Sequence, residues 1–212
     1  MKGLPMGMFS NFRYRKISQT VTVNDLLKEI FRKSIHFCAA IVPFFAAWNY
    51  NWTIFSLSLV ICLYIFCESL RLRGISIPFI SRITAFAARS RDQGRFVLGP
   101  VTLALGVLFA LILYPPEIAK VGIYTLAFGD GIASLAGRLL GKTKIPFTRG
   151  KTVEGSIACF TAVYISSFLV LYNPFYSLLI AFLAMLIEML PLKDYDNLVI
   201  PLVICSFVCL LP

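Results

Sequence analysis

The stretch IAKVGIYTLAFGDGIASLAGRLL, residues 118–140, places an aspartate in the middle of an otherwise apolar segment. About 17–25 largely apolar residues cross the hydrocarbon core of a bilayer as one helix, so this segment predicts a transmembrane helix. A carboxylate inside such a helix is costly unless it meets a cation. Asp130 is therefore the first candidate for a functional residue.

The composition around this segment is that of a membrane protein. The 212 residues are 58% hydrophobic and 14% charged, and the mean hydropathy is +0.82, which leaves too few polar side chains to cover a water-soluble globule. Six further stretches approach spanning length: Ser34–Trp48, Trp52–Cys67, Phe96–Tyr114, Gly155–Tyr172, Phe175–Leu190 and Asn197–Leu211. The fold class predicted is an all-α, polytopic membrane helix bundle of about seven transmembrane helices, with residues 34–212 as a single transmembrane catalytic domain.

Basic residues indicate how the bundle is oriented. When seven spans are threaded from a cytoplasmic N-terminus, every lysine and arginine except Lys120 falls on the cytoplasmic side, as the positive-inside rule requires. We therefore expect a multi-pass integral membrane protein whose N-terminus and active site face the cytoplasm. The net charge of +10 follows from this topology, and no nucleic-acid partner is expected.

Two segments are predicted as amphipathic helices lying in the membrane interface. Residues 1–33 form a basic N-terminal segment, and the helix expected in it, Asn24–Ser34, has apolar residues at helical spacing. The second, Phe79–Arg89, has an apolar face opposite its arginines.

Gly-Lys-Thr occurs twice after the acidic span and raises the question of a phosphate-binding loop. A Walker motif, G-x-x-x-x-G-K-[ST], needs glycine at the positions held by Ala136 and Ile145. Both copies fail, so a P-loop NTPase is rejected. The ingredients of phosphate binding nevertheless remain, because a helix begins near Thr152 beside four basic residues, Lys142, Lys144, Arg149 and Lys151.

The acidic span also carries a stripe of small and polar residues, Asp130, Ser134, Gly137 and Gly141. Tight helix packing and ligand binding are equally weighted readings of the glycines and the serine. Asp130 is expected to meet either Arg138 or a divalent metal, and the metal is favoured because Mg²⁺ is usually shared between one or two carboxylates and substrate phosphates.

Other acidic residues and the single histidine are expected on the same side of the membrane. For Glu68 and Glu188, an ion pair with Arg71 or Lys193 and a role in the site are both open. Glu154 lies in the first turn of a span, where a carboxylate complements the helix dipole. His36 is interpreted mainly as interfacial filling, with a general base or phosphate contact as the alternative.

The stretch FGDGIASLAGRLLGKTKIPFTRGKTVEGSIA, residues 128–158, resembles the nucleotide-binding stretch of the CTP-dependent lipid-alcohol kinases. This family comprises dolichol kinase, phytol kinase and CTP-using diacylglycerol kinase. RKSIH (32–36), ESLRLRG (68–74), RDQGRFVLGP (91–100) and DNLVIP (196–201) support the resemblance. The chain is distantly similar to phosphatidate cytidylyltransferases, but it lacks their later histidine motif and has DYDN in place of their acidic signature.

The resemblance implies transfer of the terminal phosphate of CTP to the hydroxyl of a membrane lipid, a polyprenol or dolichol, a phytol-like alcohol or diacylglycerol, with Mg²⁺ or another divalent cation. The expected catalytic residues are Asp130, Glu154 and Asp196, of which Glu154 and Asp196 are alternative proton acceptors. Metal ligands are expected among Asp130, Glu68 and Asp196. The expected nucleotide-binding residues are Gly131, Ser134, Gly137, Arg138, Lys142, Lys144, Arg149, Gly150, Lys151, Thr152, Gly155 and Asn197, and the accessory residues are Arg32, Lys33, His36, Arg91 and Arg95.

Two other functions remain as alternatives. A phosphatidate cytidylyltransferase would use the same metal and nucleotide but would release pyrophosphate and a CDP-lipid. A non-enzymatic membrane transporter is disfavoured because the chain shows no internal repeat.

Overall fold

The computed structural model describes residues 23–75, 84, 94–148 and 150–212. Within these residues the regular elements are all helices, apart from one isolated β-bridge between Lys144 and Thr152. The helices are α1 (Val23–Ala39), α2 (Val42–Trp48), α3 (Tyr50–Leu72), α5 (Gly99–Leu113), α6 (Pro116–Tyr124), η2 (Thr125–Asp130), α7 (Gly131–Leu139), α8 (Val153–Leu171), α9 (Pro174–Met189) and α10 (Asp196–Cys209). The all-α prediction is confirmed.

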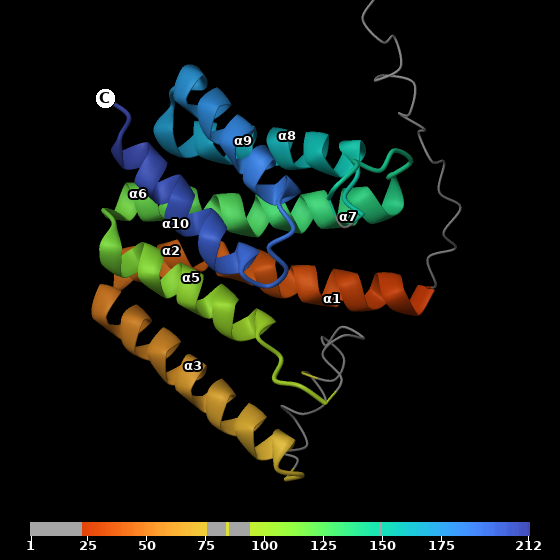
Figure 1. Ribbon diagram of the computed structural model, residues 1–212. Coiled ribbons are helices and arrows are strands. Elements are labelled where there is room, and N and C mark those ends of the chain that lie inside the picture. The colour runs from red at the N-terminus through yellow and green to blue at the C-terminus, as the bar shows by residue number, and fades with distance from the viewer. Residues whose placement is uncertain (1–22, 76–83, 85–93, 149) are drawn as a thin grey trace, which may run out of the picture.

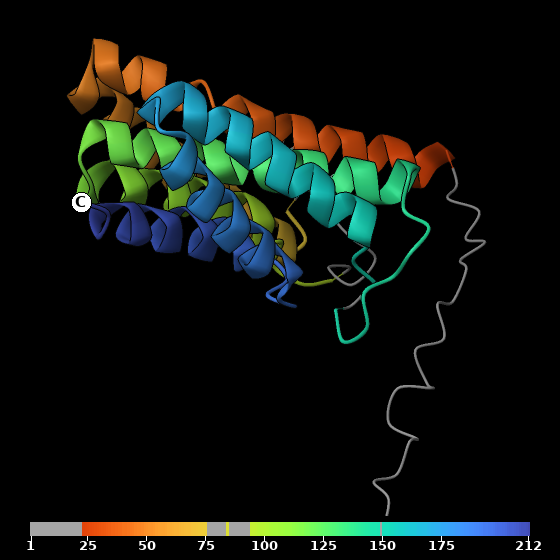
Figure 2. The same cartoon turned by 90° about the horizontal axis from the view of Figure 1, so that it is seen from above.

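The chain passes back and forth along the bundle, with α2 continuing in the direction of α1 and with α6, η2 and α7 forming one pass (Figure 1). Short turns at Asn49, Tyr114–Pro115 and Tyr172–Asn173 lie at the end that also holds the C-terminus. The connections of residues 140–152 and 190–195 lie at the opposite end, where α1 begins (Figures 1 and 2). We call this second end the polar end, because the charged residues discussed below gather there.

Four of the helical segments are long and apolar enough to cross a membrane: Leu26–Trp48, Tyr50–Leu72, Pro116–Leu139 and Val153–Leu171. Three shorter apolar helices, α5, α9 and α10, have 15, 16 and 14 residues. At 1.5 Å per residue they reach only about 21–24 Å, compared with a hydrocarbon core of about 30 Å. The seven predicted stretches are thus all helical, while seven complete spans remain a prediction.

The predicted surface helix Asn24–Ser34 is not a separate element. It forms the first turns of α1, which continues without interruption to Ala39. Glu29 and Lys33 are buried in this part of the helix, and α1 packs against η2 and α7. A helix with two buried charged residues facing its neighbours cannot lie flat in the interface, and the prediction is corrected accordingly. The second predicted surface helix, Phe79–Arg89, lies outside the described residues except for Thr84.

The chain turns between α1 and α2 because of a proline. Pro43 occupies the first turn of α2. It has no N–H to donate, and its ring would clash with the carbonyl four residues earlier if α1 continued. The first span is therefore two helices joined by a short turn.

One rod, made of α6, η2 and α7, forms the centre of the bundle. It packs against α1, α5, α8 and α10, and Ala119, Val121, Ile123, Leu126 and Ala127 in it are completely buried. The π-helical segment η2 widens the helix by one residue per turn just before Asp130. Asp130 thus lies where the π-helical segment meets α7, within this buried central rod.

Glycines set the closest helix crossings. A Cβ atom on Gly155 of α8 would lie 2.8 Å from the carbonyl oxygen of Ala133 on α7. A Cβ atom on Gly106 of α5 would lie 2.2 Å from the carbonyl oxygen of Asn197 on α10. These crossings bring the backbones of α7 and α8, and of α5 and α10, together near the polar end.

The outer surface is apolar, as a lipid-facing surface should be. On α3, Trp52, Phe55, Val60 and Phe66 are 58–66% exposed. Since a soluble protein would not leave such a helix face uncovered, the exposed apolar side chains and the four long apolar helices together indicate a membrane protein.

Candidate functional site

A cavity of about 350 Å³ opens at the polar end of the bundle. We call it the large cavity. Residues of α1, α7, the start of α8 and the end of α9 line it, together with the connections 140–152 and 190–195. Its charged lining comprises five basic residues, Arg32, Lys33, Arg138, Lys151 and Lys193, and four acidic ones, Glu29, Asp130, Glu188 and Asp196.

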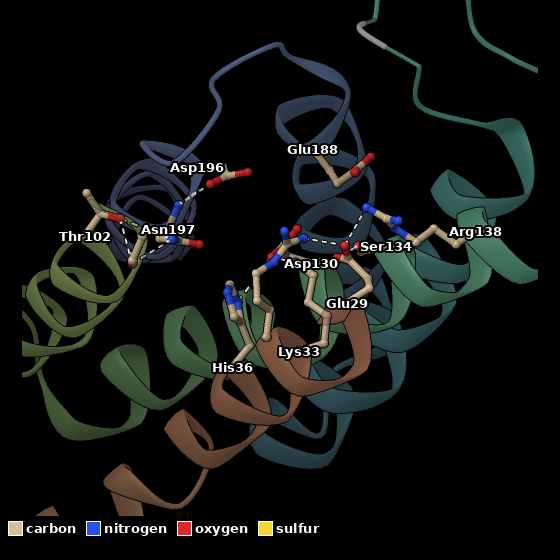
Figure 3. A network of polar contacts seen from close by, with 12 residues as sticks. Glu29, Lys33, His36, Thr102, Asp130, Ser134, Arg138, Glu188, Asp196 and Asn197 are labelled. Carbon is tan, nitrogen blue, oxygen red and sulfur yellow. Dashed lines mark hydrogen bonds and ion pairs between the residues drawn. The ribbon is translucent and has the colours of Figure 1, made fainter. Parts of the chain in front are cut away.

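Asp130 is buried and engaged by α1. Its Oδ2 pairs with the Lys33 ammonium, and the Nδ1 of His36 lies 3.2 Å from the same oxygen. Lys33 and Asp130 meet at the centre of Figure 3, with His36 beside them. Arg138, the less favoured of the two partners expected for Asp130, is paired with Glu29 instead. The cation that makes Asp130 tolerable comes from another helix.

Arg138 instead pairs with Glu29, a carboxylate that is only 1% exposed. The Arg138 guanidinium lies 2.6 Å from Glu29 Oε2. Arg32 pairs with the same oxygen, and the Ser134 hydroxyl donates to Glu29 Oε1. Glu29 therefore ties α1 to α7 through Arg138 and through Ser134, a residue of the predicted stripe (Figure 3).

Lys151 is also held by a carboxylate. Its Nζ lies 2.6 Å from Glu188 Oε1, and it also donates to the Glu188 backbone carbonyl. The next residue, Thr152, caps α8, since its Oγ1 accepts a hydrogen bond of 3.2 Å from Gly155 N. The prediction that a helix begins here beside basic residues is confirmed, and Gly150, Lys151, Thr152 and Gly155 all line the large cavity.

The rest of the Gly-Lys-Thr connection lies outside this cavity. Lys142 and Lys144 are exposed and line neither cavity. Glu154 accepts hydrogen bonds from Thr143 N at 3.2 and 3.3 Å, and it also lines neither cavity. In this structure Glu154 holds the connection against α8, and Lys142 and Lys144 are not brought to Asp130.

A second, smaller cavity of about 50 Å³ adjoins the first. Arg32, Lys33, Asp130 and Asp196 line both cavities. The small cavity adds His36 from α1, Asn197 from α10 and an apolar wall from the start of α5. Asn197 Nδ2 donates to Thr102 Oγ1 at 3.1 Å and to Gly99 O at 3.2 Å, which fixes α10 against α5.

Four other predicted residues are placed away from both cavities, and two are not described. Glu68 accepts two hydrogen bonds from Arg71, at 2.7 and 2.8 Å, and one of 2.8 Å from Val97 N. Gly131 packs against Phe37, Gly141 packs against Thr152, and the Arg95 side chain is exposed. Arg91 and Arg149 lie outside the described residues.

The donor set is compatible with a hard divalent cation shared with a ligand. Among the described residues, no group of three or more His, Cys, Asp and Glu side chains is gathered closely enough to hold a metal alone. Mg²⁺ seldom needs such a cage, because one or two carboxylates together with phosphate oxygens and water suffice. Asp130 and Asp196 line the same two cavities and supply suitable oxygens.

Sequence reasoning missed Glu29 altogether. Its signal was present, because Glu29, Arg32, Lys33 and His36 follow the i, i+3, i+4, i+7 spacing of one helix face. That face was overlooked because the apolar face of the same segment suggested a helix lying on the membrane. Glu188 does form an ion pair, with Lys151 rather than Lys193. It also lines the large cavity, and its role in the site stays a prediction.

Curated proteins similar to this chain are plant enzymes. Phytol kinase 1, chloroplastic, of Arabidopsis thaliana is 30% identical over 152 residues, which cover 62% of this chain and 49% of the relative. Probable phytol kinase 3, chloroplastic, of Glycine max is 27% identical over 89% of this chain and 65% of the relative. Farnesol kinase, chloroplastic, of Arabidopsis thaliana is 33% identical over 40% of this chain and 28% of the relative.

The resemblance to the lipid-alcohol kinases is confirmed. It rests on homologues at 25–33% identity, and the chain spans about half the length of most of the lipid-alcohol kinases it matches. No family model matches the chain. No solved structure matches it either.

Proposed function

We propose that this protein is a membrane-embedded kinase that transfers the terminal phosphate of CTP to the hydroxyl of an isoprenoid or related lipid alcohol. The observation that carries the proposal is the large cavity, where Asp130, Lys33 and Lys151 converge at one end of an apolar helix bundle. The homologous phytol and farnesol kinases support an alcohol as acceptor. The choice of CTP rests on the resemblance of residues 128–158 to the CTP-dependent family.

The charge balance of the large cavity supports a polyanionic ligand accompanied by a divalent cation. Five basic residues face four carboxylates there, so the lining carries one net positive charge. A triphosphate carries several negative charges, and burying it against so little positive charge would be costly. When bound beside Asp130 and Asp196, Mg²⁺ would supply the missing positive charge on the phosphates.

The cations of the cavity would exchange partners when the nucleotide binds. Lys33, Arg138 and Lys151 are each paired with a carboxylate in the structure described here. Charge-assisted bonds to phosphate oxygens are of the same kind and strength as those to carboxylate oxygens. The internal ion pairs thus keep the cations oriented toward the cavity until phosphates replace their partners.

Phosphoryl transfer needs mainly positioning and neutralisation of charge. The alcohol oxygen forms a bond to the γ-phosphorus, and the bond from that phosphorus to the bridging oxygen breaks, releasing CDP. We assign Asp196 as acceptor of the hydroxyl proton, because it lines both cavities while Glu154 lines neither. The basic residues of the large cavity hold the phosphates.

The test uses the purified protein in lipid nanodiscs with CTP labelled at either the α or the γ phosphate. With phytol, farnesol, a polyprenol or diacylglycerol as acceptor, we expect label in the lipid only from γ-labelled CTP, with CDP as co-product, and loss of transfer when EDTA is added. Asp130→Asn should lower the rate at least about 100-fold, as expected when one preorganised charge of a reaction site is lost.

Other outcomes would overturn the proposal. Label in the lipid from α-labelled CTP, with release of pyrophosphate, would identify a cytidylyltransferase. Absence of turnover with every acceptor and nucleotide would point to the transporter alternative. The same assay with ATP, GTP and UTP tests the choice of nucleotide independently of the choice of acceptor.

A further inference from the structure

Resting on the proposed function, we infer that the small cavity is the subsite for the acceptor hydroxyl, and that Ile35 and Leu103 determine which alcohols reach it. The two cavities share a wall of four charged residues, Arg32, Lys33, Asp130 and Asp196. These four side chains lie between a group bound in one cavity and a group bound in the other, and their charges are of the kind that phosphoryl transfer uses.

The sizes of the two cavities assign them to different ligands. The large cavity measures about 350 Å³ and the small one about 50 Å³. Since one water needs about 10–15 Å³ of such volume, the small cavity has room for a few atoms. It can take a hydroxymethyl group but not a nucleotide.

The residues that line the two cavities also indicate different ligands. The residues found only in the large cavity include three cations, Arg138, Lys151 and Lys193. The small cavity instead adds apolar side chains from α1 and from the start of α5: Ile35, Val97, Pro100 and Leu103. Phosphates are favoured on the first side, and the first carbons of a lipid chain on the second.

The position of the apolar wall fits an acceptor that arrives from the bilayer. Ile35 belongs to a helix segment, Leu26–Trp48, that is apolar enough to cross a membrane, and Leu103 lies on an apolar helix of 15 residues. An alcohol whose chain lies among the lipids would pass between these two helices. Its hydroxyl would then meet Asp130 and Asp196 from the side opposite Lys151.

Asp194, His36 and Asn197 complete the subsite as polar groups. All three line the small cavity and none lines the large one. His36 lies against Asp130, while Asn197 is held by Thr102 and Gly99. Figure 3 shows His36 and Asn197 near one another at the edge of the network, away from Arg138.

The decisive experiment compares Michaelis constants for the two substrates. Ile35→Trp fills the small cavity, so we expect the KM for farnesol to rise at least tenfold while the KM for CTP stays within twofold. Ile30→Trp is the matched control, because Ile30 lies on the same helix, is 45% exposed and lines neither cavity. Lys193→Gln, in the large cavity only, should raise the KM for CTP and leave that for farnesol unchanged. A rise in the KM for CTP alone in Ile35→Trp would overturn the inference.

A binding measurement covers the case in which Ile35→Trp does not fold. A photoreactive diazirine analogue of farnesol is cross-linked to the unaltered protein, and the labelled peptides are identified by mass spectrometry. Labelling of α1 and α5 that phytol suppresses is the expected result, and labelling confined to α8 and α9 would contradict it. If the protein phosphorylates no alcohol, the proposed function fails, whereas the position of the label still decides the subsite.

Discussion

Glu29 shows how one side chain can organise a polar site inside an apolar bundle. Its carboxylate meets Arg32, Arg138 and Ser134, and it is 1% exposed. The cost of burying it is offset because every nearby charge is paired and hydrogen-bonded. It thereby keeps two arginines at the edge of the large cavity and neutralises part of their charge.

Replacing Glu29 by glutamine should separate these two effects. The variant loses the charge that orients the arginines, so we expect a lower unfolding temperature, corresponding to about 1–3 kcal/mol for a lost charge-assisted network. Because Arg32 and Arg138 are then less neutralised, we also expect the dissociation constant for CTP to fall at least threefold, measured by titration calorimetry.

The matched control is Glu117→Gln, since Glu117 is exposed in the first turn of α6 at the opposite end of the bundle. It should alter neither quantity. Weaker CTP binding in Glu29→Gln would show that Glu29 orients the cations more than it competes for them.

At the scale of the element, the crossing of α7 and α8 positions the stripe of small residues. Gly137 and Gly155 face one another across this crossing. A Cβ atom added to either glycine would contact the Cα atom of the other. The same two glycines therefore allow α7 and α8 to pack closely and also line the large cavity. The π-helical segment then sets the direction of Asp130 relative to this crossing.

Gly155→Ala should weaken the crossing. The added methyl group would lie 2.8 Å from a backbone carbonyl, which cannot move without shifting α7. Overpacking of this kind costs about 1–3 kcal/mol, so we expect the unfolding temperature in detergent to fall by several degrees.

Gly99→Ala provides the comparison for stability, because a Cβ atom there meets nothing within 4 Å. Its unfolding temperature should stay constant or rise, since alanine is the better helix former. Equal unfolding temperatures for the two variants would mean that α7 and α8 are not held this closely.

Across the whole molecule, helices of different length create a recessed polar site. Figure 1 shows α1 and α7 extending beyond the ends of α5 and α10 at the polar end. The residues at the ends of shorter helices, Glu188 and Asp196, therefore line the same cavity as Lys33 and Asp130, which lie within longer ones. Under the proposed function, this recess is where a lipid hydroxyl would meet Asp130 and Asp196.

Cysteine accessibility can establish whether the three short helices cross the bilayer. In a background without the six native cysteines, single cysteines are placed at Arg95, Glu117, Tyr172, Tyr195 and Leu210, which flank α5, α9 and α10. We expect a membrane-impermeant maleimide to label positions 117, 172 and 210 from outside intact bacterial cells, and positions 95 and 195 only after permeabilisation. Labelling of 172 and 195 from the same side would rule out a crossing by α9, and the same comparison applies to the other helices.

Much of this fold could be predicted because the membrane imposes simple rules. Runs of apolar residues located six of the seven helical stretches to within a few residues, whereas the first was expected to begin at Ser34 and its helix begins at Val23. The sequence could not predict which of these helices pack against one another. Nothing in the local pattern states that α1 supplies Lys33 to Asp130, since the two residues are separated by 97 positions and the contact depends on how α1 packs against η2.

The candidate site divides in the same way. Asp130, Lys151 and Asp196 were expected from their chemistry and do line one cavity, whereas Lys142, Lys144, Glu154 and Glu68 have equally suitable chemistry and point elsewhere. The second group is kept out of the cavity by tertiary contacts. Glu154 bonds to the 140–152 connection, and Glu68 pairs with Arg71.

The sequence by itself determined that this chain is an apolar helical protein with a carboxylate inside a membrane helix, because hydrophobicity and charge act residue by residue. Tertiary structure alone decided which cation neutralises each carboxylate and which charged residues share a cavity. Ion pairs and cavities depend on distances of a few ångströms between helices, and those distances are set by side-chain packing across the whole bundle.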